Sequence, residues 1–149
     1  MSNILTFREL KKNIKKPKDG FASIKVAILG DTSTQLLNTA IAGFGVEKKV
    51  AYKIYEADYD MIEQEVFNTT SELYQFEPEI VILAPSTEKL LLKFQKTQQD
   101  KRRDLANEQI EKFNNLYSIL EEHLKCKVCL LYTSPSPRDA TLSRMPSSA

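Results

Sequence analysis

IKVAILGDTSTQ, the stretch at residues 24–35, changes abruptly from apolar to small and polar side chains. Residues 24–29 suit a strand buried on both faces, because a parallel strand covered by helices is almost continuously apolar. The glycine that follows permits a sharp turn before an amphipathic helix. Ligands of open α/β sheets bind at the carboxyl ends of strands, where helix N-termini converge. The sequence therefore predicts a binding loop, with helix capping by Asp31 or a threonine as the structural alternative. Its residues are Gly30, Asp31, Thr32, Ser33, Thr34 and Gln35.

Three more segments have the pattern of strands. Residues 50–55 alternate in polarity, residues 80–84 read IVILA and suit a buried strand, and residues 125–128 would begin a fourth strand. Helical patterns separate these segments. Strands alternating with helices predict an α/β three-layer sandwich with a parallel sheet, SGNH-like or flavodoxin-like, interrupted in its fourth strand.

The helices are predicted from apolar spacing and from breakers. A helix over residues 34–42 should end at Gly43 and Gly45, and short helical pieces are expected at residues 61–67 and 71–76. Thr87 should cap a helix that begins near Glu88. A long last helix carries a packing stripe, which is expected to be core. Its residues are Ala106, Ile110, Phe113, Tyr117, Leu120 and Leu124.

Two polar residues follow the other predicted strands. Asp58 comes after the strand at residues 50–55, and Ser86 after the strand at residues 80–84. Because the carboxyl ends of parallel strands share one edge of a sheet, we expect Asp58 and Ser86 to join the loop at residues 30–35 in one concave site.

Composition favours one soluble domain. The 149 residues are 42% hydrophobic and 28% charged, and the formal net charge is +1. This balance gives no general attraction to nucleic acid or acidic membranes, and no apolar run approaches the length of a membrane span. The N-terminus lacks a secretory signal, and the chain has two cysteines, so a cytoplasmic location is expected.

A basic helix is predicted at the N-terminus. Thr6 and Glu9 have the spacing of a capping box, and Phe7, Leu10 and Ile14 follow at helical spacing. The other face is either a solvated surface or a contact for a phosphate-bearing partner such as a carrier protein. It carries Arg8, Lys11, Lys12, Lys15 and Lys16.

Residues 129–149 differ in kind from the rest of the chain. Three of the six prolines lie there, and the segment lacks apolar periodicity. Back-translation of CLLYTSPSPRD and of SRMPSSA gives strings that match a sequencing-library adapter. We expect a non-native tail from Cys129 onward, with natural sequence up to Val128, order up to about residue 132, and a loosely attached remainder.

Short catalytic motifs are incomplete. Gly30, Asp31 and the hydroxyls of Thr32 and Ser33 resemble the first block of SGNH or GDSL hydrolases, which makes Thr32 and Ser33 the candidate nucleophiles. The single histidine, His123, precedes the fourth strand, whereas in those hydrolases it follows the last one. Asp58 and Asp60 form a D-x-D pair of the kind found in haloacid-dehalogenase phosphatases, for which chance is the alternative. The sequence contains no P-loop, no G-x-G-x-x-G motif, no H-E-x-x-H zinc motif and no paired-cysteine motif.

Longer segments carry a more specific resemblance. LTFRELKKNIKK, KVAILGDTSTQLL and the run from YEADY through SELYQF to APSTEKLL resemble, in this order, the N-terminal region of FkbH-like proteins of the HAD-IIIC group. The resemblance implies an SGNH-like domain at residues 21–128 after a basic helix and linker at 1–20. It also implies a downstream HAD domain, missing here, that uses Mg²⁺. No cofactor is expected in the fragment itself.

Three functions follow as hypotheses. The resemblance implies an accessory domain of an enzyme that removes phosphate from a glyceryl phosphate donor and loads the glyceryl unit onto an acyl carrier protein, in polyketide or polysaccharide biosynthesis. The alternatives are an SGNH-type esterase fragment and a non-catalytic module that binds a carrier protein. The fragment alone is expected to be inactive.

Overall fold

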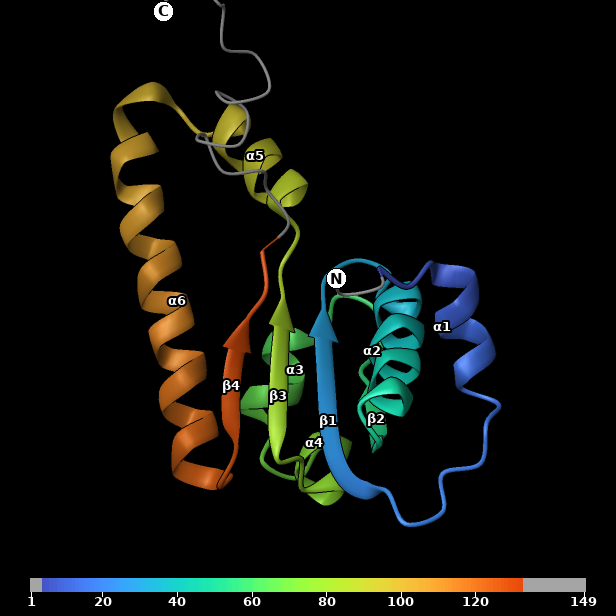
Figure 1. Cartoon of the computed structure of the whole chain (residues 1–149). Helices are drawn as coiled ribbons and strands as arrows, with labels where there is room; N and C mark the ends of the chain where they lie inside the picture. Colours follow the sequence, from blue (N-terminus) through green and yellow to red (C-terminus); the bar gives the residue numbers. More distant parts are fainter. Residues whose placement is uncertain (1–3, 133–149) are drawn as a thin grey trace, which may run out of the picture.

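The computed structural model describes residues 4–132, which form a four-stranded parallel sheet between helices (Figure 1). The strand order is β2-β1-β3-β4, so the predicted three-layer α/β architecture is confirmed. The strands are β1 (Ala22–Gly30), β2 (Val50–Glu56), β3 (Ile80–Ala84) and the short β4 (Lys127–Leu130). The helices are α1 (Phe7–Asn13), α2 (Gln35–Glu47), α3 (Ile62–Phe67), α4 (Glu72–Phe76), α5 (Thr87–Lys96), the 3₁₀ turn η1 (Gln99–Lys101) and α6 (Arg102–His123).

Strand β1 lies inside the sheet, as its apolar sequence predicts. Val26, Ala27, Ile28 and Leu29 are at most 2% exposed, and β1 pairs with β2 on one side and β3 on the other. Strand β3 is also internal, because β4 pairs with it through residues 127–130. The open edges within the described residues are therefore β2 and β4, and Cys129 and Leu130 belong to β4.

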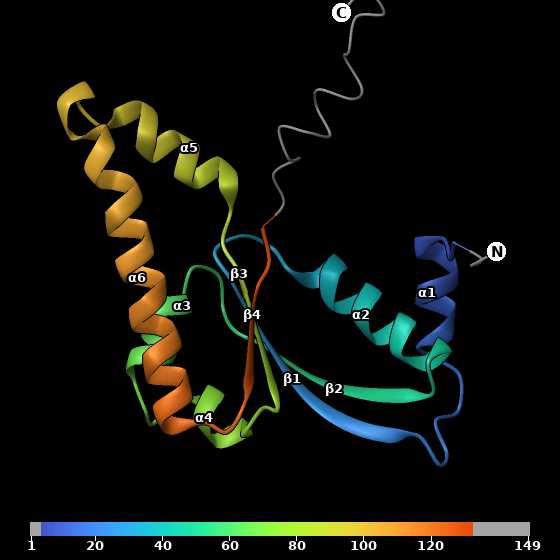
Figure 2. The same ribbon diagram turned by 60° about the vertical axis from the view of Figure 1, so that its left-hand side comes forward.

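The closed core lies on the face covered by α3, α4 and α6 (Figure 2). Alternate residues of β1 and β3 point to it, including Leu29, Val81 and Leu83, and Leu116 of α6 packs against them. The stripe predicted on the last helix is partly wrong. Leu120 and Leu124 are buried as expected, but Leu105 and Leu116 are the other buried positions of this region, while Ala106 and Ile110 are exposed. The N-terminal part of α6 faces α5 rather than the sheet, so one stripe cannot serve its whole length.

Helix α2 continues through both glycines that were expected to end it, and it stops at Glu47. A Cβ at Gly43 would overlap the backbone carbonyl of Leu10 in α1, and a Cβ at Gly45 would lie 2.5 Å from the ring of Tyr52 in β2. Glycine in a helix costs about 1 kcal/mol relative to alanine. Here that cost permits the close approach of α1 and β2, so the glycines serve packing and not termination.

Helix α1 begins with the predicted capping box. The backbone N–H of Thr6 donates to Oε2 of Glu9 at 2.7 Å, and the N–H of Glu9 donates to Oγ1 of Thr6 at 3.4 Å. The side-chain amide of Asn13, which is 4% exposed, donates to the carbonyl of Gly43 at 3.5 Å. These bonds and the Gly43 contact fix α1 against α2.

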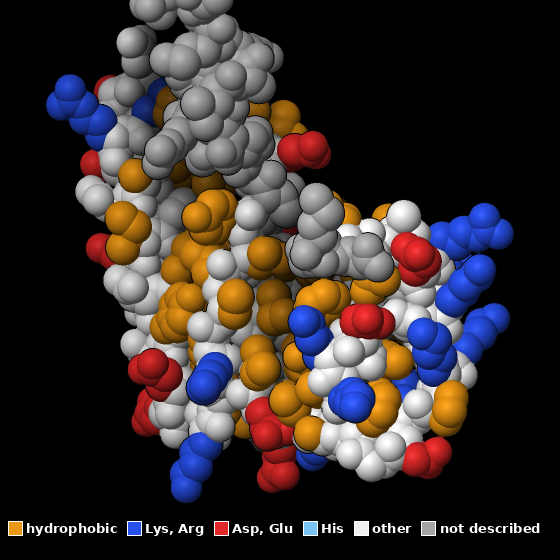
Figure 3. Space-filling view, in the orientation of Figure 1, with side chains coloured by type: hydrophobic (Ala, Val, Ile, Leu, Met, Phe, Trp, Pro, Cys, Tyr) orange, Lys and Arg blue, Asp and Glu red, His pale blue; other side chains and the backbone are white. Residues whose placement is uncertain are grey.

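The second face of the sheet is only partly covered, because α2 packs on the β2 side of the sheet and α1 packs on α2 (Figure 1). Ile80 and Ile82 of β3 point to this face and remain partly exposed, and their neighbour Cys129 is exposed. Figure 3 shows hydrophobic side chains gathered over this part of the sheet. The sheet therefore has one closed face and one half-open face.

Candidate functional site

A cleft of about 590 Å³ opens at the carboxyl edge of the sheet. Asp31 follows β1, and Pro85 and Ser86 follow β3, at its floor. Helices α3, α5 and α6 form its walls. Their side chains in the cleft include Ile62, Glu63, Lys89, Leu90, Lys93, Gln109, Lys112 and Phe113. The position agrees with the rule that open α/β sheets bind ligands beyond their carboxyl ends.

Asp31 joins the two loops at the floor of the cleft. Its Oδ1 accepts a hydrogen bond of 2.7 Å from the backbone N–H of Ser86, and Oγ of Ser86 accepts one of 3.3 Å from the N–H of Lys89. Ser86 is thus the N-cap of α5, which starts at Thr87, one residue earlier than predicted. Asp31 does not cap α2, which has no side-chain cap. It holds the beginning of α5 from the end of the neighbouring strand instead.

Three lysines of the cleft each lie beside a carboxylate. Nζ of Lys89 is 3.2 Å from Oδ1 of Asp60 and lies 4.6 Å from the centre of the Tyr59 ring. Lys93 pairs with Glu108 at 3.6 Å, and Lys112 pairs with Glu63. Exposed pairs of this kind contribute about 0–1 kcal/mol each. Each lysine can therefore leave its partner carboxylate and bind an anionic group of a ligand at a small cost in free energy.

The charge of Lys89 is supported by its neighbours. Partial desolvation alone would lower the pKa of its ammonium group. Hydrogen bonds with Tyr59 and Asp60, together with the Asp60 charge, outweigh that effect and raise the pKa above its ordinary value. Lys89 thus stays protonated across the neutral range.

The structure brings only part of the predicted site together. Asp31 and Ser86 line the cleft. Thr34 is buried, and its hydroxyl donates to Oε1 of Glu56 at 2.5 Å. Gly30 has no room for a side chain, because its Cβ would lie 2.5 Å from Cγ2 of Thr34. The remaining loop residues Thr32, Ser33 and Gln35 are exposed to solvent outside the cleft lining.

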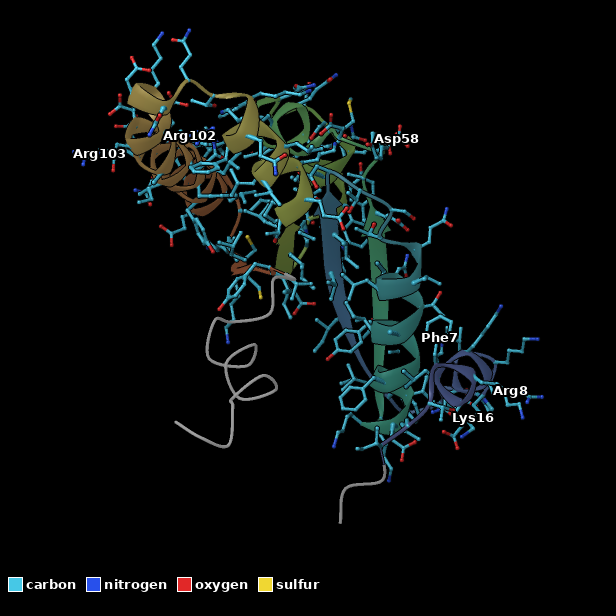
Figure 4. The ribbon with its side chains drawn as sticks, turned by 90° about the horizontal axis from the view of Figure 1, so that it is seen from above. Phe7, Arg8, Lys16, Asp58, Arg102 and Arg103 are labelled. Carbon is cyan, nitrogen blue, oxygen red and sulfur yellow. The ribbon has the colours of Figure 1, made fainter. Side chains whose placement is uncertain are left out.

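Asp58 lies in a different hollow, of about 300 Å³. It is lined by Tyr55, Glu56 and Glu65 among others, and Figure 4 labels Asp58 at the upper right of the view. Burial, followed by the charge and hydrogen bond of Glu65, raises the pKa of Tyr55 well above its ordinary range. Asp60 has a φ of 62° and faces the cleft. The turn between them separates the D-x-D carboxylates, and the prediction of one site holding all the named residues is wrong in this respect.

Sequence reasoning missed the cleft residues Lys89, Lys93 and Lys112, and it named Asp60 only as part of the D-x-D pair. The spacing of four between Lys89 and Lys93 was an available signal, because it puts both side chains on one face of α5. Nothing in the sequence links Lys112 of α6 to Glu63 of α3, since 49 residues separate them.

The described residues do not fit a magnesium site. No group of three His, Cys, Asp or Glu side chains within residues 4–132 is arranged to hold a metal ion. Mg²⁺ needs near-octahedral coordination by oxygen ligands. The carboxylate of Asp60 in the cleft is instead paired with Lys89.

His123 does not approach the candidate nucleophiles. It ends α6, shortly before β4 begins, and so lies toward the amino-terminal edge of the sheet. There its ring packs edge-on against the ring of Tyr74, with 6.1 Å between the two ring centroids. Thr32 and Ser33 follow β1 at the carboxyl edge. The single histidine of the sequence is therefore not a base for either hydroxyl.

Comparisons with known proteins agree with this architecture. The family model described as "FkbH, N-terminal domain" matches residues 25–134. A crystal structure of the N-terminal part of protein BF1531 from Bacteroides fragilis, described as containing a phosphatase domain and complexed with Mg, superposes with a TM-score of 0.78 and 33% sequence identity. The match covers 95% of this chain and 38% of that one. No curated protein matches the chain. No helix within residues 4–132 combines the length and apolar character that crossing a bilayer requires.

Proposed function

Because the chain belongs to the family of FkbH N-terminal domains, we propose that it is the accessory domain of an FkbH-like enzyme and that its cleft positions a carrier-bound acyl or glyceryl substrate. In this proposal, a HAD domain of the full-length enzyme removes phosphate with Mg²⁺, as the phosphatase domain and metal of the Bacteroides fragilis structure suggest. The pathway is the biosynthesis of a polyketide or polysaccharide in the cytoplasm, where the thiol of Cys126, the cysteine that precedes the expected non-native tail, remains free.

The observation that carries the proposal is the bond between Asp31 and the Ser86 amide at the floor of the cleft. It places a carboxylate, a helix N-terminus and the lysines of α5 around one cavity, with Leu90 and Phe113 in its walls. A glyceryl or acyl unit on a pantetheine arm needs hydrogen-bonding groups for its hydroxyls and amides and apolar walls for its methylenes. The cleft offers both.

Binding of a pantetheine thioester tests this assignment. Titrating the isotope-labelled 149-residue chain with glyceryl-pantetheine should shift the backbone amide signals of Ser86, Lys89 and Gln109. Asp31→Asn keeps an oxygen acceptor for the Ser86 amide but removes the charge, so we expect a change in stability below about 1 kcal/mol and weaker binding by roughly tenfold.

Asp58→Asn is the matched control, because it makes the same chemical change in the other hollow. It should leave binding unchanged. Equal weakening by both variants, or signal shifts spread away from the cleft, would contradict the assignment of the cleft.

An independent esterase is the second candidate, and the position of His123 argues against it. A hydroxyl nucleophile needs a base within hydrogen-bond reach. We expect the purified chain to hydrolyse neither phosphate esters nor p-nitrophenyl acyl esters. Turnover that Thr32→Ala or Ser33→Ala abolishes would favour the esterase instead.

A further inference from the structure

Five cations form one surface on α1 and the turn after it, the α1 basic stripe, made of Arg8, Lys11, Lys12, Lys15 and Lys16. All are exposed. Residues three, four and seven positions apart lie on one helix face, and helical hydrogen bonds continue to Lys16, whose N–H donates to the carbonyl of Asn13 at 2.9 Å. Figure 3 shows basic side chains along the edge of the molecule where Figure 1 places α1.

The stripe is strongly charged in a nearly neutral protein. Residues 1–20 contain six of the 21 basic residues and two of the 20 acidic ones, a net charge of +4. The rest of the chain therefore carries −3 within the total of +1. The positive charge is concentrated on one short element.

The stripe also lacks internal compensation. Among residues 4–132, the ion pairs involve Lys89, Lys93 and Lys112, and none involves the stripe. Glu9 attracts Lys12, but its Oε2 accepts both the N–H and the hydroxyl of Thr6 at 2.7 Å. Like charges at helical spacing repel by a few tenths of a kcal/mol per pair. A surface of opposite charge relieves that repulsion.

The stripe is held in a fixed orientation. Gly43 lets the α1 backbone touch α2, and Asn13 donates to the Gly43 carbonyl. Leu10 lines the hollow beside α2, whereas Phe7 of the same helix is exposed. A rigid array of charges binds a partner with less loss of conformational entropy than a flexible tail does.

We propose that the α1 basic stripe is the docking surface for an acidic helical face of the carrier protein; this inference rests on the proposed function. The seven-residue spacing from Arg8 to Lys15 spans about 10 Å, roughly two helical turns, which matches carboxylates repeated along one helix. The sequence pI of 7.7 is well below the strongly basic values typical of nucleic-acid-binding domains.

Docking and substrate positioning use separate parts of the molecule. The stripe lies on the α2 side of the sheet, whereas the cleft is bounded by α3, α5 and α6. Figure 4 shows Arg8 and Lys16 at the end of the molecule opposite Arg102 and Arg103. A variant can therefore lose one property and keep the other.

The test measures binding of a fluorescently labelled bacterial acyl carrier protein, with its phosphopantetheine arm, to the 149-residue chain. We expect micromolar affinity that falls as salt is raised, because exposed charges are screened. The triple variant Lys11→Glu, Lys12→Glu, Lys15→Glu should weaken binding at least about tenfold.

The control variant Lys101→Glu, Lys125→Glu, Lys127→Glu changes the net charge equally at exposed positions away from α1. It should change affinity less than about twofold. Equal loss in both variants, absence of carrier binding, or tighter stripe-dependent binding to phosphatidylglycerol vesicles or duplex DNA would overturn the proposal. Asp31→Asn should leave carrier docking intact, so failure of the cleft assignment is distinguishable from failure of docking.

Discussion

Neighbouring residues of one strand meet different environments on the two faces of the sheet. In β3, Val81 and Leu83 are fully buried against the core that includes Leu116, whereas Ile80 and Ile82 remain partly exposed beside α2. All four side chains are aliphatic. Their burial depends on which helix crosses above them, so an apolar strand sequence predicts a buried strand without revealing that one face is open.

The largest expected effect separates the two faces directly. Leu116→Ala should lower the free energy of unfolding by about 2–5 kcal/mol, because it leaves a cavity in a closed core. Ile82→Ala should cost roughly half as much or less, since solvent already reaches that side chain. Urea denaturation of both variants measures the difference, and equal losses would show that the half-open face is as well packed as the closed one.

The next largest effect concerns the contact that holds α1 over the half-open side. Gly43→Ala adds a methyl group where the Leu10 backbone lies, and we expect destabilisation by about 1–3 kcal/mol. The sign is informative, because alanine at an unconstrained helix position would stabilise by about 1 kcal/mol. Thermal unfolding decides between the two signs, and a stabilised variant would mean that α1 can move away without loss.

The reactivities of two cysteines allow the two faces of the sheet to be compared without a mutation that alters packing. Cys126 is partly buried against the closed core, and burial raises the pKa of its thiol, whereas Cys129 is exposed. The thiolate is the reactive form, so iodoacetamide at pH 8 should modify Cys129 several times faster. Peptide mass spectrometry over time measures both rates. Faster modification of Cys126 would contradict the assignment of the closed face.

The smallest expected effect is the pH dependence of the α1 cap. Hydrogen bonds from the Thr6 backbone and hydroxyl lower the pKa of Glu9 below its ordinary value of 4.5. The contribution of this carboxylate is therefore present above pH 4.5 and is lost as the pH falls through the lower folded value. NMR titration of the Thr6 amide should report the transition, and Glu9→Gln should abolish it. An unchanged titration in that variant would assign it to another group.

Much of the fold could be predicted because its signals are local. The capping box of Thr6 and Glu9, the apolar run of β1 and the strand at residues 80–84 each depend on neighbours in sequence. The end of α2 could not be predicted from Gly43 and Gly45. Whether a glycine breaks a helix or permits close packing is decided by Leu10 and Tyr52, which are distant in sequence.

The sequence predicted which residues follow the carboxyl ends of the strands, but not which of them line one cavity. The rule for parallel sheets identified the carboxyl edge, and Asp31 and Ser86 do meet there. The orientation of each other loop side chain depends on tertiary partners. Thr34 turns to Glu56, and the left-handed turn at Asp60 sends Asp58 and Asp60 to different hollows.

The bond between Asp31 and Ser86 makes the binding of an anion at the start of α5 a displacement reaction. An anion that seeks the Ser86 amide competes with a carboxylate already delivered by the protein at 2.7 Å. The observed affinity is the anion's own affinity reduced by the free energy of releasing Asp31. This built-in competitor discriminates against inorganic anions, whereas a neutral glyceryl or pantetheine ligand can donate hydrogen bonds to the Asp31 carboxylate without displacing it.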